Sequence, residues 1–340
     1  MKFLLFSLIG NGPHPLTGRV PAERETFQRV LKQAVLCEEK GFYGFGVGER
    51  HGPPFLSSSP AVVLAGIAAR TSQVKLFTTV TVLSVLDPVR VAEDFATLDH
   101  LSDGRLELMI GKGNDPRHYS LFGIAEEKQW DSLEERYSLL KRLWAEENVT
   151  WKGKCRPPLK EVTTKPRPLQ SSIRVWHGSA SSKRSTELAA KHGEPIFSSN
   201  TFHPMPKYKE LIDHYRERLA YYGHDPNKAV VGAGAGGLYI ANSREEAIQR
   251  YRPYYHAFHH TDAAKVNQSP FQSLEDNINN GPVLVGSPEQ IAEKILFYQQ
   301  AFGHQFQSIS VDGLEEAEQQ EQIIRFAEEV MPLVKREMVV

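Results

Sequence analysis

Residues 87–114 read DPVRVAEDFATLDHLSDGRLELMIGKGN, and this stretch indicates the fold of the whole chain. Asp87 and Pro88 open a segment with helical spacing of apolar residues, since aspartate caps helices and proline suits their first turn. Gly104 then marks a turn, and residues 106–110 form an apolar run with the length of a buried strand. A helix that leads through a short turn into a buried strand is typical of parallel α/β folds.

The same alternation extends in both directions from this stretch. Strands are expected at residues 3–9, 42–47, 74–83, 106–110, 173–176, 195–198 and 306–311, and one further strand within residues 230–241. Helices are expected at residues 22–40, 59–69, 88–101, 132–146, 182–191, 207–222, 244–260, 288–302 and 314–334. Eight strands with helices between them predict an α/β fold, a (β/α)8 TIM barrel that forms one domain over residues 1–340.

Two stretches do not fit the alternation and are expected as insertions. Residues 148–172 follow the fourth helix and carry four prolines. Residues 261–286 precede the last helix and strand of the barrel and read as polar and irregular. Long loops of this kind in compact domains are usually functional lids or mobile segments.

Composition narrows the class of protein. The chain has 40 basic and 41 acidic residues, a net charge of −1 that gives no general attraction to nucleic acid or to an anionic membrane. The opening MKFLLFSLIG is followed by Asn11-Gly12-Pro13 instead of a small-residue cleavage site, so we expect a buried first strand. The two cysteines, Cys37 and Cys155, fit no metal spacing, and so few thiols suggest a cytoplasmic protein.

The residues that follow the second predicted strand are the candidates for catalysis. In a TIM barrel the chemistry lies at the carboxyl ends of the strands. Glu49, Arg50 and His51 stand in a row at such an end and can supply a charge pair and an imidazole that titrates near neutral pH. The alternative is a solvated loop with an internal ion pair.

The third and fourth predicted strands end in residues that suit a flat cofactor. Residues 78–83 read TTVTVL, and their hydroxyls either face a cofactor or, as we favour, satisfy hydrogen bonds within the barrel. Gly111 and Gly113 can let a flat ring lie close to the backbone, although a turn also uses glycine. Asn114 can hydrogen-bond a ring amide through its own amide.

The loop after the fifth predicted strand resembles a phosphate cradle. It consists of five small residues and leads into a helix: Gly178, Ser179, Ala180, Ser181 and Ser182. Free backbone N–H groups, hydroxyls and a helix N-terminus favour a bound phosphate, and Lys183 and Arg184 add positive charge. An ordinary helix cap is the alternative.

Two other patterns are not expected to bind ligands. Residues 232–237 read GAGAGG and fit the dinucleotide fingerprint G-x-G-x-x-G, but a further strand and not a helix follows them, so no nicotinamide site is predicted there. His256, His259 and His260 have helical spacing but no obvious carboxylate or thiol partner, so no metal site is predicted.

Together these motifs resemble the bacterial luciferase-like flavin-dependent monooxygenases. The segments that carry the resemblance are residues 48–51, 87–94, 98–105, 111–113, 166–168, 187–193 and 286–295, in the family's order. The resemblance implies a TIM barrel, usually a homodimer, in which reduced FMN, often delivered by a separate flavin reductase, reacts with oxygen and a small organic substrate is oxidised. It places the flavin ring near Thr79, Val80, Gly111 and Asn114 and the phosphate on residues 178–182, and it implies a cis peptide at Thr79–Val80.

The chain departs from the luciferases in one residue with chemical consequences. Luciferases carry Glu-His-His after the second strand, whereas Arg50 stands here in place of the first histidine and only His51 is kept. Arginine stays protonated and cannot act as a general base, but it can bind an anion or hold an oxygen electrostatically. Gly111 also replaces a luciferase thiol, so oxidation of another small molecule is expected, not light emission. A deazaflavin-dependent reductase and a non-catalytic flavin-binding protein are the alternatives.

Overall fold

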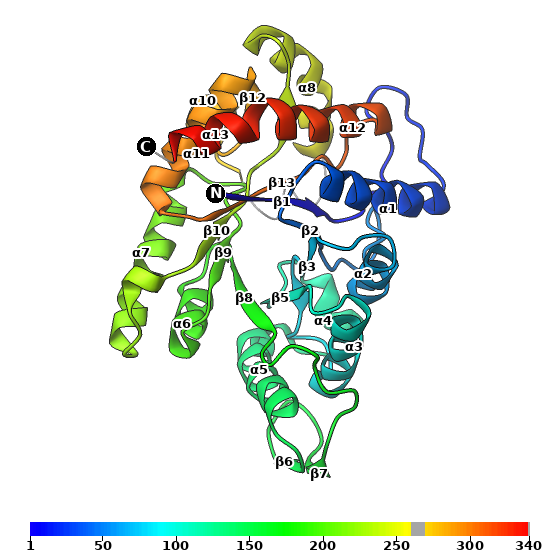
Figure 1. Ribbon diagram of the computed structural model, residues 1–340, viewed down its shortest axis with the longest axis vertical. Coiled ribbons are helices and arrows are strands. Elements are labelled where there is room, and N and C mark those ends of the chain that lie inside the picture. The colour runs from blue at the N-terminus through cyan, green and yellow to red at the C-terminus, as the bar shows by residue number, and fades with distance from the viewer. Residues whose placement is uncertain (260–268, 339–340) are drawn as a thin grey trace.

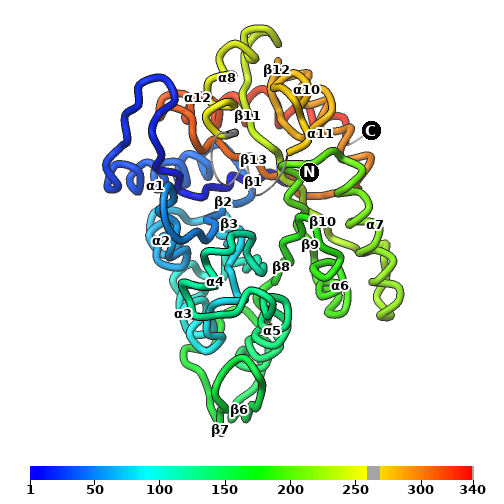
Figure 2. The backbone as a smooth tube through the Cα atoms, turned by 180° about the vertical axis from the view of Figure 1, so that it is seen from behind, coloured from blue at the N-terminus to red at the C-terminus, as the bar shows by residue number. Residues whose placement is uncertain are grey.

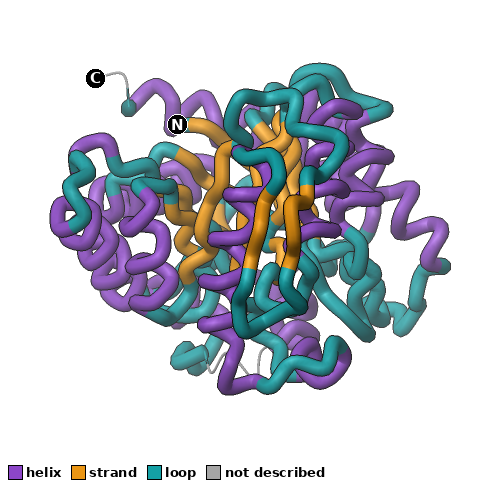
Figure 3. Tube along the Cα trace, turned by 90° about the horizontal axis from the view of Figure 1, so that it is seen from below, coloured by secondary structure: helices purple, strands orange, loops and turns teal. Residues whose placement is uncertain are grey.

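The computed structural model describes residues 1–259 and 269–338 and contains a closed barrel of eight parallel strands with helices outside it (Figures 1 and 3). The barrel strands are β1 (Lys2–Ser7), β2 (Gly44–Val47), β3 (Lys75–Thr78), β5 (Leu106–Gly111), β8 (Arg174–Ser179), β9 (Ile196–Ser198), β10 (Val231–Ala233) and β13 (Phe306–Ile309). Their order around the barrel is β3-β2-β1-β13-β10-β9-β8-β5, and β3 pairs with β5 to close it. The predicted TIM barrel is confirmed.

Parallel pairing brings the carboxyl ends of all these strands to one rim of the barrel. The helices that return the chain to the opposite rim are α1 (Glu23–Glu39), α2 (Pro60–Ala68), α3 (Pro88–Leu101), α5 (Gln129–Ala145), α6 (Lys183–His192), α7 (Met205–Tyr221), α8 (Arg244–His259), α11 (Pro288–Phe302), α12 (Glu316–Arg325) and α13 (Met331–Glu337). In α3 the sequence signals act as expected, since the Asp87 carboxylate accepts a hydrogen bond of 2.8 Å from the Val89 N–H. Among the described residues, no helix has the length and apolar character needed to cross a membrane.

Aromatic side chains fill the barrel interior around a buried carboxylate. Trp176 is fully buried, and its ring lies 4.9 Å from that of Phe306. Its Nε1–H donates to Glu107 Oε2 at 2.7 Å, and Tyr43 Oη–H donates to Glu107 Oε1 at 2.9 Å. Both carboxylate oxygens of Glu107 therefore have a donor inside the barrel.

Trp176→Phe is expected to destabilise the protein by about 2 kcal/mol, because it leaves a buried carboxylate oxygen without its donor. Trp144→Phe is the matched control, since Trp144 Nε1–H donates to a neutral backbone oxygen, that of Ala92, and its loss is expected to cost only about 1 kcal/mol. Urea unfolding of both variants measures the difference. Equal losses would contradict the assigned role of the Glu107 contact.

Residues 230–241 contain the expected strand, β10, and a second short strand. The strand leaves the barrel after Ala233, and β11 (Leu238–Ile240) pairs in parallel with β12 (Leu284–Gly286) in a separate two-stranded sheet. The break falls on glycines: a Cβ on Gly234 would lie 2.1 Å from the Ser199 backbone oxygen, and one on Gly236 would lie 2.7 Å from that of Thr201. The backbone packs too closely there for any side chain. The strand β11 follows residues 232–237, so the expectation that a strand and not a helix follows the fingerprint is confirmed.

The prediction that residues 261–286 are irregular is wrong for the later part of this segment. Residues 261–268 lie outside the described residues, but α10 (Leu274–Asn280) and β12 follow them. Leu274, Ile278 and Leu284 are buried, so the later part of this segment is ordered by packing against the core. The prediction missed α10 and β12 because both are short. The strand that pairs with β12, β11, is also distant from it in sequence.

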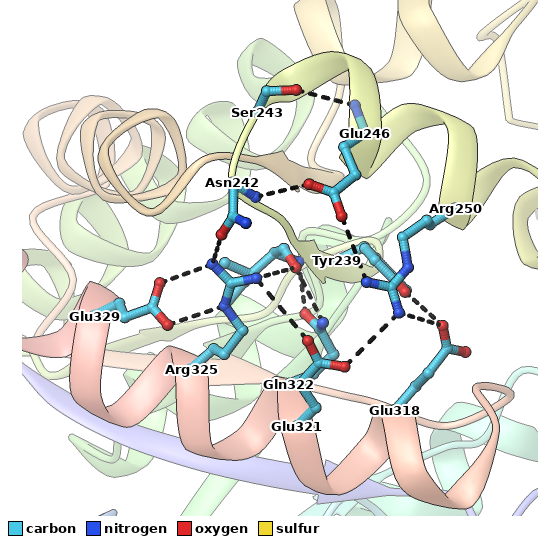
Figure 4. A network of polar contacts seen from close by, with 11 residues as sticks. Tyr239, Asn242, Ser243, Glu246, Arg250, Glu318, Glu321, Gln322, Arg325 and Glu329 are labelled. Atoms are coloured by element: carbon cyan, nitrogen blue, oxygen red, sulfur yellow. Dashed lines mark hydrogen bonds and ion pairs between the residues drawn. The ribbon is translucent and has the colours of Figure 1, made fainter.

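A polar network connects the two-stranded sheet of β11 and β12 to α12 (Figure 4). The Gln322 amide on α12 exchanges two hydrogen bonds with the Ile240 backbone in β11, of 2.5 and 3.1 Å. Arg250 on α8 pairs with Glu318 on α12 at 3.3 Å, and Glu318 also accepts from Tyr239. Figure 4 shows these side chains converging between the three elements, which holds the segment after β10 in place over the barrel.

The insertion at residues 148–172 is confirmed as an excursion from the barrel. It contains the antiparallel strands β6 (Val149–Trp151) and β7 (Leu159–Val162) and projects at the end of the molecule far from α8 and α10 (Figures 1 and 2). The predicted strand at residues 74–83 is split into β3 and β4 (Thr81–Val82), and the Thr79–Val80 peptide between them is cis, as expected. A short helix, α4 (Arg117–Leu121), was not predicted.

Asp99 and Arg105, which lie on either side of the turn before β5, contact different elements. Asp99 accepts hydrogen bonds from the backbone and side chain of Gln170, at 2.8 and 2.7 Å. Arg105 instead donates to backbone oxygens at the end of α2, including Ala68 at 3.1 Å. The guanidinium satisfies carbonyl groups that a helix end leaves without partners, so each residue fastens a different element.

Candidate active site

A cavity of about 1170 Å³ opens at the carboxyl rim of the barrel. Its walls come from the segments that follow several strands, from the loop after β1 and from α8. The predicted cofactor residues all line it: Thr79, Val80, Gly111, Gly113, Asn114 and residues 178–182. The loop proposed to hold phosphate and the rim proposed to hold a ring therefore open into the same space.

Gly111 and Gly178 lie beside Val80, and glycine is needed at both positions to make room for the Val80 side chain, not for a ring as expected at Gly111. A Cβ on Gly111 would lie 2.8 Å from Val80 Cγ2, and a Cβ on Gly178 would lie 2.7 Å from Val80 Cγ1. The space beside both glycines is thus occupied by the Val80 side chain, not left free for a ligand. Since Val80 itself lines the cavity, a flat ring in this position would rest on its methyl groups.

The Thr78 hydroxyl has the structural role that we favoured, since its hydrogen bonds lie within the barrel. Its Oγ1–H donates to the Met109 backbone oxygen at 2.8 Å, and Thr78 Oγ1 in turn accepts from the Met109 N–H at 2.9 Å. These bonds join β3 to β5 within the barrel wall. Thr78 is therefore part of the scaffold beneath the cavity.

The loop at residues 178–182 has two exposed residues in front of a helix N-terminus. Ala180 and Ser181 are exposed, while the Ser182 hydroxyl caps α6 by accepting from the Arg184 N–H at 3.2 Å. Ser179 is buried, and its Oγ lies 3.1 Å from Ser185 Oγ. The first N–H groups of a helix have no partners within it, so this end of α6 can receive an anion.

The charges expected to assist that loop are engaged elsewhere. Lys183 Nζ lies 2.7 Å from Glu210 Oε1, and Arg184 lies 3.0 Å from both Asp131 and Glu134. Because these side chains form ion pairs with residues of α5 and α7, they do not act as free cations at the loop. The backbone and hydroxyl groups remain the donors for an anion.

Ser199 is a site residue that the sequence analysis missed. It follows β9 at the same rim and lines the cavity, and its Oγ is buried with no hydrogen-bond partner among the described residues. A buried hydroxyl without a partner is unusual in a folded protein and indicates a polar group that would occupy the cavity. Applying the strand-end rule to residue 199 would have found it.

Glu49 and His51 form an internal pair behind the cavity. Glu49 Oε1 lies 2.9 Å from His51 Nε2, and its Oε2 accepts from the Val82 N–H at 2.8 Å. The His51 ring packs edge-on against Phe122, 4.8 Å away, and lines neither of the two cavities at this rim. The pair joins the loop after β2 to β4. The internal ion pair of the alternative interpretation is therefore present, but it is largely buried and not solvated.

Arg50, between them in sequence, reaches the cavity. Its Nη1–H donates to Asn114 Oδ1 at 2.5 Å, and its guanidinium lies 5.6 Å from the centre of the Phe55 ring. Burial lowers the pKa of Arg50, which indicates that its charge is poorly solvated. One acceptor position of the Asn114 carbonyl is thereby used, and its N–H₂ group remains available to donate to a ligand.

A cluster next to residues 178–182 fixes the end of β8. His177 Nε2 lies 2.8 Å from Glu194 Oε2, Lys141 Nζ lies 2.8 Å from Glu194 Oε1, and Tyr137 also donates to this carboxylate. Burial acts to raise the pKa of Glu194, but the hydrogen bonds from His177 and Lys141 outweigh it and lower that pKa to about 2. His177 directly precedes Gly178, so the cluster positions the loop.

Among the described residues, no group of three or more histidines, cysteines or acids is arranged to hold a metal ion. His256 lies on α8 with its ring 5.9 Å from that of Tyr255, and His260 lies outside the described residues.

Comparison with known proteins places this site in a family. A family model described as luciferase-like monooxygenase matches residues 1–305. The limonene 1,2-monooxygenase of Rhodococcus erythropolis is 28% identical over 277 residues, which cover 77% of this chain and 69% of that protein. An uncharacterized protein of Sinorhizobium fredii, y4wF, is 36% identical over 124 residues, and the match covers only 36% of either chain.

Solved structures share the fold over nearly the whole chain. The monooxygenase RslO1 from Streptomyces bottropensis is 25% identical with a TM-score of 0.86, and the match covers 98% of this chain and 99% of that one. The oxygenating constituent of 3,6-diketocamphane monooxygenase from Pseudomonas putida, in complex with FMN, is 21% identical with a TM-score of 0.79 and 98% coverage of both chains. An F420-dependent secondary alcohol dehydrogenase in complex with an F420–acetone adduct is 18% identical with a TM-score of 0.76, again with 98% coverage of both. The chain belongs to the luciferase-like monooxygenase family.

Proposed function

We propose that this protein is an FMN-dependent monooxygenase that uses reduced FMN and molecular oxygen to oxidise a small organic substrate. The observation that carries the proposal is the shared cavity, in which residues 178–182 face the same space as Val80 and Asn114. The relative that contains FMN, the oxygenating constituent of 3,6-diketocamphane monooxygenase, supports the choice of cofactor.

The residues of the cavity fit FMN at its polar and its flat end. The N-terminus of α6, the Ser181 hydroxyl and the unpartnered Ser199 hydroxyl are donors suited to a phosphate and a polyol chain. Val80 offers an apolar surface of the kind that a tricyclic ring packs against. When bound and reduced, FMN supplies the electrons for the reaction with oxygen.

The remaining site residues have positioning and electrostatic roles in this proposal. The Glu49–His51 pair holds the loop after β2 against β4, and this loop carries Arg50 to the cavity. Arg50 places a positive charge at the cavity wall, and its half-buried position strengthens the effect of this charge on its neighbours. Arg50 orients or stabilises a negative group but transfers no proton.

The electrons are proposed to come from a separate flavin reductase. The one dinucleotide fingerprint noted in the sequence, residues 232–237, leads into β11 and opens no helix, so it lacks the geometry that holds a pyrophosphate. Oxidation of substrate is therefore expected to require reduced FMN or a reductase added with NADH.

The test is a titration followed by turnover. FMN is expected to bind with a change in its fluorescence and, once reduced, to support oxygen uptake that depends on an organic substrate. Binding of F420 with no binding of FMN would instead identify a deazaflavin-dependent reductase. This alternative is tested because the chain shares its fold with the F420-dependent dehydrogenase. Tight FMN binding without uptake across a broad substrate panel would indicate a non-catalytic binder.

A further inference from the structure

Arg50 is a half-buried cation, and no carboxylate among the described residues forms an ion pair with it. Its Nη1 is held by Asn114 Oδ1, whereas Nε and Nη2 have neither a hydrogen bond nor an ion pair among the described residues. The carboxylates beside it are engaged: Glu49 binds His51 and the Val82 N–H, and Asp115 lies 2.6 Å from Arg117. The free Nε–Nη2 edge of a guanidinium is the edge that binds a carboxylate through two parallel hydrogen bonds.

A second unpartnered donor lies near Arg50. The His118 side chain is 1% exposed, and its Nε2 accepts a hydrogen bond of 3.3 Å from the His51 backbone N–H. Burial lowers the pKa of His118 to about 4, so the ring is neutral at pH 7 and its proton is on Nδ1. Nδ1 has no partner among the described residues, which leaves a buried N–H group unsatisfied.

Both donors border a small cavity behind the large one. This cavity has a volume of about 50 Å³ and is lined by Arg50, His118, Thr79, Gly113 and Asn114, among others. Glu49 also lines it, and both oxygens of its carboxylate are engaged, by His51 and by the Val82 N–H. His118 Nδ1 lies beside Gly113, since a Cβ built there would be 3.8 Å from it. A site of this size holds a water molecule, which needs about 10–15 Å³, or a group of a few atoms. Arg50, Val80 and Asn114 line both cavities, so the small one adjoins the proposed flavin position.

We propose that Arg50 and His118 form a carboxylate-binding site and that the substrate of this protein is a small organic acid. The inference rests on the proposed function, because it assigns the substrate class of that same cavity. Apolar side chains surround the approach to Arg50, including Leu8, Pro54 and Phe55, so the rest of the acid is a hydrocarbon skeleton. Since luciferases have a histidine at the place of Arg50, this recognition would be a specific property of chains that carry the arginine.

The test uses benzoate and its neutral isostere benzamide, titrated calorimetrically into the protein first without flavin and then with FMN. Benzoate is expected to bind more tightly than benzamide to the unmodified protein. Arg50→Gln is expected to weaken benzoate binding at least 20-fold, in the range of a lost charge-assisted hydrogen-bond pair, and to change benzamide binding less than about 2-fold. His118→Phe is expected to weaken benzoate binding about 5-fold, as for one neutral donor.

Arg19→Gln is the matched control, since Arg19 lines the same large cavity but is paired with Glu25 at 3.0 Å. It is expected to leave benzoate binding unchanged. Equal binding of benzoate and benzamide, or unchanged benzoate affinity in a folded Arg50→Gln variant, would overturn the proposal. A shift in the FMN reduction potential of that variant without loss of benzoate affinity would also overturn it, because Arg50 would then act on the cofactor. Failure of FMN to bind would sink the proposed function alone, since the titration without flavin remains readable.

Discussion

Ser181→Asp is expected to weaken FMN binding at least 100-fold. Ser181 is exposed in front of the first turn of α6 and lines the large cavity, so a carboxylate there would lie against the FMN phosphate. Two like charges 4 Å apart repel by about 4 kcal/mol at an effective dielectric constant of ~20, and 100-fold in affinity corresponds to about 2.8 kcal/mol. Quenching of FMN fluorescence on titration measures the change.

An acidic residue at position 181 does not disturb the packing, because Ser181 is exposed. Gly178 is a poorer choice, since any side chain at that position would collide with Val80 and loss of binding could reflect misfolding. Ser171→Asp, an equally exposed change just before β8 and remote from the cavity lining, is the control and is expected to bind FMN normally. Unchanged FMN affinity in a folded Ser181→Asp variant would remove the phosphate from this loop.

The barrel could be predicted from sequence because its signals are local. Buried parallel strands read as short apolar runs, as in residues 106–110, and the cap at Asp87 and the turn at Gly104 mark the helix before that run. The candidate cofactor residues followed from topology together with the family resemblance, since parallel strands deliver their carboxyl ends to one rim and the resemblance indicates which of those ends hold the flavin. The structure accordingly places Thr79, Gly111 and residues 178–182 in one cavity.

What could not be predicted depends on contacts between distant residues. The pairing of β11 with β12 joins segments more than forty residues apart, and neither strand has a pattern long enough to identify it. The space beside Gly111 is filled by Val80, a residue about thirty positions earlier in the chain that follows a different strand. His118 became a candidate only because a backbone hydrogen bond from His51 fixes which nitrogen carries its proton.

Glu194→Gln is expected to destabilise the protein by about 3 kcal/mol at pH 7. The Glu194 carboxylate receives three donors, from His177, Lys141 and Tyr137, whereas glutamine offers one oxygen and turns an N–H₂ group toward a donor. The pKa of Glu194 falls from an ordinary value of 4.5 to about 2 in the folded protein. At about 1.4 kcal/mol for each pH unit, this lowering corresponds to about 3 kcal/mol.

The sign of the pH dependence follows from that lowered pKa. Because the folded protein holds the carboxylate ionised more strongly than the unfolded chain does, its stabilisation is complete above pH 4.5 and is lost as the pH falls toward 2. The difference in unfolding free energy between the original protein and Glu194→Gln, measured by urea unfolding, should therefore shrink across this window. Glu134→Gln is the control: its ion pair with Arg184 is exposed, so a change below about 1 kcal/mol is expected. A difference that stays constant from pH 6 to pH 3 would show that the Glu194 carboxylate is not held by these donors, and the positioning of the phosphate loop through His177 would lose its basis.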